Sequence, residues 1–480
     1  MSPESRKLHL GEGPNGKESE TIVSLVRTRR QKSSQMELPL AGRGEASKRG
    51  RSGEVPTATT ENGRSGTDHL MEEVVERDNL KQALKRVKAN KGGPGIDGMT
   101  VEQLPQYLVE HWAEIRGQLL ASTYQPKPAK RQLIPKSGGG NRELAIPCVL
   151  DRFIQQAILQ VLQPRFDPTF SEHSYGFRPG RGAHDAIRAA QKHIQAGRQW
   201  VVDCDLEKAF DRINHDVLMG RLAKRITDKR MLRLIRRYLS AGLMIDGVVA
   251  ARQEGAPQGG PLSPLMMNVL LDEVDKELEK RGHAFARYAD DLNVYVGSKR
   301  AGEDVMGTLR RLFGKLKLRV NDSKSAVARP WDRKFLGFTF WMAKDGTVKR
   351  RIAPKALEAM KERIRQITGR NRGRSLKSII AELRRYLIGW KQYFRLTEMP
   401  GVFRDLDSWT RRRLRMVQLK QWRHGPRIFR ELCARGAPPN AAASAAAHAK
   451  RWWRIARHPA LNIAMPPREF DRLGLPRLVM

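Results

Sequence analysis

The spacing of apolar residues along the chain predicts a series of amphipathic helices. Apolar side chains recur every three or four residues over 71–87, over 150–162 and again over 376–394, which is the period of a helix with one buried face. The first of these segments ends in a run of Asn, Lys, Gly and Pro over 90–95, which is typical of a helix stop followed by a loop.

Short strands are predicted between these helices. Residues 131–147 read as a strand, a glycine-rich turn and a second strand, and residues 285–296 read as two strands around a tight turn. Residues 200–205 form a buried apolar strand that is expected to run into a helix beginning near Glu207. Residues 333–350 predict one more hairpin. This mixture of helices and hairpins predicts the α+β class.

Changes in composition divide the chain into four segments. Residues 1–65 contain no aromatic residue and are rich in Gly, Ser, Glu, Lys and Arg, so a disordered basic extension is expected there. The predicted helices and strands then occupy 66–352. Residues 353–436 are expected to form an all-helical basic domain, because 344–431 holds 25 Lys and Arg against 8 Asp and Glu. Residues 437–480 are expected to be a short tail that begins with an alanine-rich spacer.

The charge balance predicts a polyanionic partner. The chain carries 90 Lys and Arg against 51 Asp and Glu, a formal charge of +39, and nucleic acid is the usual partner of such an excess. No run of 18 apolar residues occurs, so a membrane span is not expected, and the polar, acid-containing first 30 residues argue against a targeting peptide. Three cysteines without a CxxC pair argue against a zinc module and fit a reducing cytoplasm.

Aspartates at the ends of two predicted strands form a candidate metal centre. Asp290 and Asp291 lie at the tip of one hairpin, and Asp203 and Asp205 end another strand. Mg²⁺ prefers carboxylate oxygens, and two Mg²⁺ ions about 3.5–4 Å apart can activate a 3′ hydroxyl and stabilise charge at a phosphate under attack. The alternatives are that Asp290-Asp291 is only a polar turn, and that Asp203 serves instead of Asp205, since residues two apart share a strand face.

Seven motifs that include these aspartates occur in a recognisable order. They are LIPK (133–136), RELAIP (142–147), SYGFRP (174–179), the stretch 205–215, PQGGPLSP (257–264), YADD (288–291) and KFLGF (334–338). In order and spacing they resemble those of group II intron reverse transcriptase/maturases, over about residues 70–475. The helix at 382–390 resembles the maturase-specific domain X of that family. The resemblance implies a right-hand polymerase fold, with fingers and palm followed by an all-helical thumb and maturase domain.

The resemblance also assigns the catalytic set residue by residue. Asp205 matches the first metal ligand and Asp290 the second, with Asp291 adjoining it, so two Mg²⁺ ions are expected at these three side chains. Asp205 is preferred to Asp203 because the family's aromatic gate lies five residues beyond the catalytic aspartate, where Phe210 stands. A ring beneath the sugar would exclude a 2′ hydroxyl and favour deoxynucleotides. The alternative for Phe210 is an ordinary core aromatic.

Other matched positions are expected to bind the incoming nucleotide. Lys136 and Arg142 flank the glycine turn and resemble residues that clamp a triphosphate; a solvated charged hairpin is the alternative. Gln258 resembles the loop residue beside the templating base pair. Lys324 resembles the lysine proposed to protonate departing pyrophosphate.

The basic helical domain is expected to bind RNA. Its candidate contacts are Arg384, Arg385, Lys391 and Arg395. The family implies that this surface, together with the fingers, grips a structured group II intron RNA and assists its splicing. A DNA target or primer and deoxynucleoside triphosphates are the other implied partners, and no membrane partner is expected.

The resemblance therefore predicts an RNA-directed DNA polymerase and intron maturase in the bacterial cytoplasm. The cysteine pairs of an HNH endonuclease are absent from the sequence, so no second-strand cleavage is expected. One alternative is a domesticated or defence-associated reverse transcriptase without an intron partner, which domain X disfavours. The other is an RNA-binding splicing factor with an inactive polymerase, which the intact Asp205, Asp290 and Asp291 disfavour.

Overall fold

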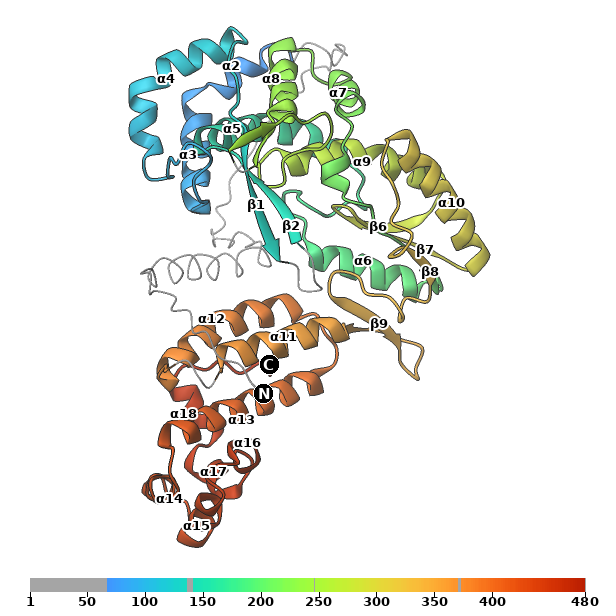
Figure 1. Cartoon of the computed structure of the whole chain (residues 1–480). Coiled ribbons are helices and arrows are strands. Elements are labelled where there is room, and N and C mark those ends of the chain that lie inside the picture. The colour runs from blue at the N-terminus through green and yellow to red at the C-terminus, as the bar shows by residue number, and fades with distance from the viewer. Residues whose placement is uncertain (1–66, 136–140, 246, 370–372, 480) are drawn as a thin grey trace, which may run out of the picture. The chain divides into compact units, whose positions relative to one another are not determined.

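The computed structural model describes residues 67–135, 141–245, 247–369 and 373–479 (Figure 1). Within these ranges the chain forms two compact units, which divide between residues 361 and 362. The larger unit also includes residues 396–399. The disordered extension predicted over 1–65 lies outside the described residues.

Helices form one part of the larger unit and contribute most of its apolar core. They are α2 Leu70–Val74, α3 Arg77–Asn90, α4 Leu104–Leu120, α5 Val149–Phe166, α7 His215–Ala223, α8 Lys229–Ser240 and α9 Ser263–Lys280. Their buried side chains belong to one continuous cluster that also includes residues of the second sheet described below. The helix predicted over 150–162 is confirmed as α5.

The single helix predicted over 71–87 is wrong, because the chain breaks between α2 and α3. Glu76 has extended backbone angles, with φ −64° and ψ 138°. The Asn79 side chain donates a hydrogen bond of 2.9 Å to the carbonyl oxygen of Val74. That bond satisfies a carbonyl which a continuous helix would have paired internally.

The first sheet of this unit has the strand order β2-β1-β4-β5. Its strands are β1 Ala129–Pro135, β2 Asn141–Ile146, β4 Leu243–Ile245 and β5 Val248–Ala250. β1 and β2 pair antiparallel, which confirms the two predicted strands; the predicted glycine turn between them lies outside the described residues. β1 also pairs parallel with β4.

The second sheet has the order β6-β7-β3-β8, with antiparallel neighbours throughout. Its strands are β3 Trp200–Cys204, β6 Ala284–Tyr288, β7 Asp291–Val296 and β8 Ala326–Ala328. Helices α6 Ala183–Gln195 and α10 Lys299–Lys315 cover opposite faces (Figure 1). The adjacent β7 residues Tyr295 and Val296 show this, because the Tyr295 ring stacks near His193 of α6 while Val296 packs at Gly302 of α10.

Two further expectations concern the segments next to this sheet. The helix expected near Glu207 is wrong: a short 3₁₀ turn, Ala209–Arg212, follows β3 instead, and α7 begins only at His215. The hairpin predicted over 333–350 is confirmed as β9 Phe338–Met342 and β10 Val348–Ile352. Helix α11, Pro354–Ile367, then leads into the smaller unit.

The described residues of the smaller unit form helices only. Besides the end of α11 these are α12 Leu376–Phe394, α13 Pro400–Trp422, α14 Gly425–Ala434, α15 Pro439–Ala447, α16 Trp452–Ile455, α17 Pro459–Ala464 and α18 Pro467–Arg472. The predicted apolar face of α12 is confirmed, with Leu383, Leu387 and Trp390 among its buried residues. In the described part of the chain, no helix is long and apolar enough to cross a membrane.

The spacer expected over 437–449 is instead the packed helix α15. Ala442 and Ala445 are fully buried, and α15 contacts α14 and α17. Alanine is the best helix former and its small side chain permits close packing, so an alanine-rich run here is structural rather than a linker. The 437–480 segment is consequently part of the folded unit.

Candidate active site

The pairing of β3 with β7 brings the predicted catalytic carboxylates to one end of the second sheet. In this antiparallel pair Cys204 lies opposite Leu292, so the same register carried on by one residue places Asp205 opposite Asp291. Asp290 lies in the two-residue turn that joins β6 to β7. The strand pairing thus brings residues from separate parts of the sequence to one end of the sheet.

These carboxylates repel one another. Burial, followed by the negative charges of Asp203, Asp290 and Asp205, raises the pKa of Asp291 to about 7. An aspartate with an ordinary pKa would be fully ionised at neutral pH. A bound cation would relieve this repulsion and keep the whole set ionised.

The donor chemistry of this end of the sheet fits a hard divalent cation. Asp205, Asp290 and Asp291 supply only carboxylate oxygens, which such ions prefer. Across the described ranges no three His, Cys, Asp or Glu side chains are already gathered at metal-ligand spacing. The fit to a divalent cation therefore rests on the chemical identity of these donors and on their mutual repulsion.

Asp203 differs from the other carboxylates here because it forms an ion pair with an arginine. Arg333 Nε and Nη2 lie 2.7 Å and 2.6 Å from Asp203 Oδ2. Burial raises the pKa of Asp203, and the Arg333 guanidinium opposes that shift. Arg333 also donates to the carbonyl oxygen of Lys324. This pairing gives Asp203 a structural partner and favours Asp205 as the metal ligand.

Lys324 reaches Asp205 from a loop that is fastened to the Asp205 backbone. Its Nζ lies 3.5 Å from Asp205 Oδ1, and both side chains are partly exposed. Asp205 N–H donates to Ser325 Oγ at 3.0 Å, and Asn321 N–H donates to the Asp205 carbonyl at 2.8 Å. The structure thus places the predicted lysine beside the first predicted metal ligand.

Gln258 is hydrogen-bonded to Asp211, the residue that follows Phe210 in the chain. Phe210 is half-buried in the 3₁₀ turn after β3, and its carbonyl oxygen accepts a 2.7 Å bond from Ala256 N–H. Gln258 Nε2 donates to Asp211 Oδ1 at 3.0 Å. The loop that carries Gln258 therefore packs on the turn that carries the proposed gate.

Gly259, beside Gln258, shows why this loop needs glycine. Its φ is +140°, and a Cβ added there would lie 2.5 Å from the carbonyl oxygen of Ala145 in β2. The Ala145 N–H also donates to the carbonyl oxygen of Gln258 at 3.0 Å. Backbone therefore meets backbone between this loop and the first sheet.

The two predicted triphosphate-binding residues are only partly described. Lys136 lies outside the described residues, and the side chain of Arg142 does as well. The Arg142 backbone belongs to β2 and pairs with Ile134 of β1.

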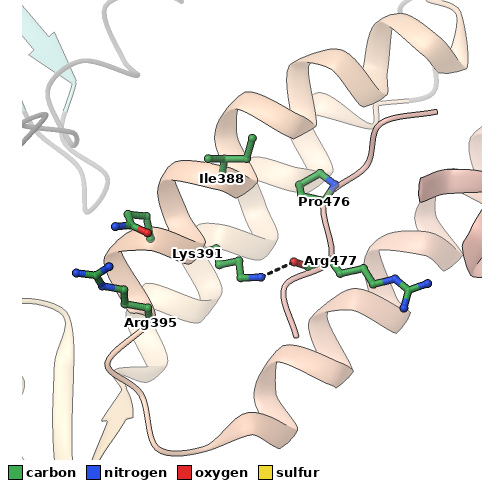
Figure 2. Close-up of a pocket in the computed structure, with 6 residues that line it drawn as sticks. Ile388, Lys391, Arg395, Pro476 and Arg477 are labelled. Carbon is green, nitrogen blue, oxygen red and sulfur yellow. Dashed lines mark hydrogen bonds between the residues drawn. The ribbon is translucent and has the colours of Figure 1, made fainter. Parts of the chain in front are cut away.

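The predicted RNA-binding residues, which lie on α12 or directly after it, do not share one environment. Arg384, Arg385 and Arg395 are exposed. Lys391 is half-buried, and its Nζ donates to the carbonyl oxygen of Arg477 at 2.9 Å (Figure 2). It also donates to the carbonyl oxygen of Val479 at 3.3 Å. Lys391 thus fastens the 476–479 segment to α12.

A basic pocket of about 580 Å³ lies at this junction of α12 and the 476–479 segment (Figure 2). Its lining is formed by Ile388, Lys391, Gln392, Arg395, Pro476 and Arg477. Ile388 is about half exposed, so the pocket combines cationic groups with an accessible apolar side chain.

Two residues at the site were missed from the sequence, Arg333 and Ser325. Arg333 immediately precedes the KFLGF motif, and Ser325 immediately follows Lys324. Both act on aspartates more than 100 positions away in the chain. Proximity to a motif was the only signal available, and it does not identify a partner.

Comparison with known proteins agrees with the order of motifs. Residues 134–340 match the family described as reverse transcriptase (RNA-dependent DNA polymerase). Residues 357–433 match the maturase-specific domain of group II introns.

Curated relatives match about half of the chain. Protein YkfC of Escherichia coli is 33% identical over 56% of this chain and 81% of its own length. Group II intron-encoded protein LtrA of Lactococcus lactis is 27% identical over 56% of this chain and 56% of its own length. A chain of a partial Cas6-RT-Cas1–Cas2 complex is 24% identical, with a TM-score of 0.35, over 54% of this chain and 45% of that one.

The chain therefore belongs to the reverse transcriptases that carry a group II intron maturase-specific domain, a class of RNA-directed DNA polymerase. The right-hand polymerase fold with a helical C-terminal region, predicted from the sequence, is confirmed. Reverse transcriptases use divalent metal ions, in line with the carboxylates at the end of the second sheet.

Proposed function

We propose that this chain copies a group II intron RNA into DNA and also binds that RNA to assist its splicing. The observation that carries the polymerase half is the group of Asp205, Asp290 and Asp291, brought together by the β3–β7 register and the β6–β7 turn. The raised pKa of Asp291 reflects the crowding of negative charge there.

Each protein side chain then has a role in nucleotide transfer. Asp205, Asp290 and Asp291 hold two Mg²⁺ ions, which when bound lower the pKa of the primer 3′ hydroxyl and stabilise charge on the phosphate oxygens. Phe210 excludes the 2′ hydroxyl of a ribonucleotide, and Gln258 lies beside the templating base. These two residues select the substrate rather than activate it.

Three further charged residues have proposed roles in binding the phosphates. Lys136 and Arg142 clamp the triphosphate of the incoming deoxynucleotide, since a guanidinium binds phosphate bidentately and an ammonium acts as a point charge. Lys324, 3.5 Å from Asp205, is close enough to the centre to deliver a proton to the departing pyrophosphate.

The smaller unit supplies the RNA-binding half of the proposal. Arg384 and Arg385 are exposed on α12, and Arg395 is exposed directly after its last residue. Lys391 of α12 and Arg395 both line the basic pocket. The family match to the maturase-specific domain covers this helix. The RNA partner is the chain's own intron, and the DNA partner is the primer or target strand.

The bacterial cytoplasm is the proposed location. Cys148, Cys204 and Cys433 are all free thiols, as expected in a reducing compartment.

The test is to separate the two activities with Asp290→Ala. DNA synthesis on an RNA template needs the metal-binding carboxylate in the transition state, so we expect a loss of at least about a thousandfold in primer extension. Splicing of the intron RNA needs only the binding surface, so it should stay within about twofold. Asp345→Ala is a matched control, because Asp345 is an exposed aspartate in the β9–β10 turn.

The outcomes discriminate among the alternatives. A folded Asp290→Ala protein that still synthesises DNA would overturn the active site. Loss of both activities in that folded variant would show that splicing depends on the polymerase centre. Wild-type synthesis without any stimulation of splicing would favour a reverse transcriptase that has no intron partner.

A further inference from the structure

A buried arginine lies in β6, directly before the turn that carries the catalytic aspartates. Arg287 is only 1% exposed, and its partner Asp275 of α9 is completely buried. Arg287 Nε lies 2.8 Å from Asp275 Oδ1 and 3.0 Å from Oδ2. A fully buried ion pair stabilises a fold little compared with apolar residues of similar volume. Stability alone therefore does not explain why Arg287 and Asp275 stand here.

The remaining N–H groups of Arg287 point toward the β6–β7 turn and its supports. Nη1 donates to the carbonyl oxygen of Ala289 and to Asn268 Oδ1, both at 2.9 Å. Nη2 donates to Ser174 Oγ at 2.8 Å. One guanidinium therefore links the turn to α9 and to the SYGFRP segment.

The turn itself is strained. Ala289 has φ +59°, in the first of the two central positions of the hairpin, where a positive φ is normally met by glycine. A residue with a Cβ rarely adopts this region and persists there only where surrounding contacts hold it.

The SYGFRP segment also contacts the turn and the residues next to it. Tyr175 N–H donates to the Arg287 carbonyl at 2.8 Å. Asn268 Nδ2 donates to the Gly176 carbonyl at 2.9 Å. A Cβ added to Gly176 would lie 2.3 Å from the Ala289 nitrogen, so only glycine lets the two backbones approach this closely.

We infer that Arg287 is a positioning residue that holds the Ala289-Asp290 turn in its strained form, with Gly176 as a second support. The bonds from Arg287 and the packing of Gly176 both act on Ala289, the residue before Asp290. They fix where the Asp290 and Asp291 carboxylates stand relative to Asp205. This role rests on the proposed function, in which those carboxylates hold the divalent ions.

The variant Arg287→Lys tests this role. A lysine keeps the positive charge beside Asp275, but its single ammonium cannot serve Asp275, Asn268 and the Ala289 carbonyl together. We expect Mn²⁺ binding, measured by electron paramagnetic resonance on the protein without nucleotide, to weaken about tenfold. We also expect kcat of primer extension to fall about a hundredfold, with little change in the KM for the nucleotide.

The matched control is Arg230→Lys. Arg230 is likewise an ion-paired arginine, with the carboxylates of Glu72 and Asp228 as its partners, but it touches neither the turn nor the SYGFRP segment. The Arg230→Lys variant should have a lower melting temperature than the wild type but unchanged Mn²⁺ binding. Gly176→Ala provides an independent perturbation of the same turn and should reproduce the Arg287→Lys pattern. If Arg287→Lys does not fold, Gly176→Ala carries the test.

A folded Arg287→Lys protein that melts earlier yet binds Mn²⁺ and extends primers like the wild type would overturn the inference. So would wild-type Mn²⁺ binding by a folded Gly176→Ala protein. Failure of the proposed function is distinguishable, because then the wild-type protein itself would not extend a primer on an RNA template.

Discussion

Arg333 Nη2 lies 2.6 Å from Asp203 Oδ2, with side chains that are 29% and 12% exposed. Asp203 and Asp205 stand two positions apart at the end of β3, where they share a face. Arg333 forms an ion pair with Asp203, whereas Lys324 Nζ lies 3.5 Å from Asp205 Oδ1. The two aspartates of one short motif therefore have different neighbours, and different roles are expected of them.

Substitution of each aspartate should separate these roles. Asp205→Ala should lower primer extension by at least about a thousandfold, through loss of a metal ligand, with little effect on folding. Asp203→Asn should keep synthesis within about tenfold of the wild type but lower the free energy of unfolding by about 1–3 kcal/mol, because Arg333 loses its charged partner. Denaturant titration and primer extension on both proteins would check this. A thousandfold loss in Asp203→Asn would make Asp203 the ligand.

Phe210 should determine which sugar is accepted. Phe210→Ala should reduce discrimination against ribonucleotides by at least about tenfold, because the steric barrier to a 2′ hydroxyl is removed. The measurement is the ratio of kcat/KM for a deoxynucleotide and the matching ribonucleotide. Tyr107→Ala, which changes another partly buried aromatic at the same core, should leave the ratio unchanged. An unchanged ratio in Phe210→Ala would place the gate elsewhere.

The raised pKa of Asp291 predicts a pH dependence of stability without divalent ions. The folded protein binds this proton up to a pKa of about 7, whereas the unfolded chain releases it near the ordinary value of 3.8. Because the folded state binds more protons in between, the free energy of unfolding should fall as the pH rises from about 4 to about 7.

Melting temperatures measured in a chelator across that pH range would show the effect. Asp291→Asn should flatten the decline, and added Mg²⁺ should flatten it in the wild type by stabilising the ionised carboxylates. Asp345→Asn, at the exposed β9–β10 turn, should not change the slope. An identical slope in wild type and Asp291→Asn would contradict the crowded-carboxylate account.

Charge reversal on α12 should weaken RNA binding more than polymerisation. Arg384→Glu with Arg385→Glu should lower affinity for the intron RNA by at least about tenfold. The plot of log affinity against log salt should also become less steep by about two, since two phosphate contacts are lost. Extension of a simple primer–template should change little.

The same reversal at Lys299 and Arg300 of α10 is the matched control, because both residues are exposed and the change of charge is equal. Equal loss of RNA affinity in both double variants would mean that only total charge matters. A wild-type salt slope near zero would exclude phosphate contacts as the main source of binding.

Sequence reasoning succeeded where the signal was local. The hairpin of β6 and β7, the buried strand β3 and the apolar face of α12 each follow from the spacing of side chains within about 20 residues. The catalytic aspartates could be placed at strand ends for the same reason. Their meeting is a consequence of the antiparallel order β6-β7-β3, which the spacing of side chains does not give.

The elements that were predicted wrongly depend on contacts between segments that are distant in the sequence. The break at Glu76 depends on a side-chain bond from Asn79, and the packing of α15 depends on α14 and α17. The 3₁₀ turn after β3 is tied by Ala256 N–H to the carbonyl of Phe210. Spacing within one segment contains no information about such partners, so propensity alone gave a longer helix, a spacer and an early helix start.

The strained Ala289 turn has a consequence for finding such enzymes in uncharacterised sequences. Four letters, YADD, occur by chance, and the tetrapeptide has no means of holding its own geometry. What holds it here is Arg287 one residue upstream of the tetrapeptide, Gly176 about a hundred residues earlier, and Asn268 with Asp275 seven apart on one face of α9. A search that requires these four residues at their places in the motif order should reject chance tetrapeptides and retain hairpins able to present their carboxylates.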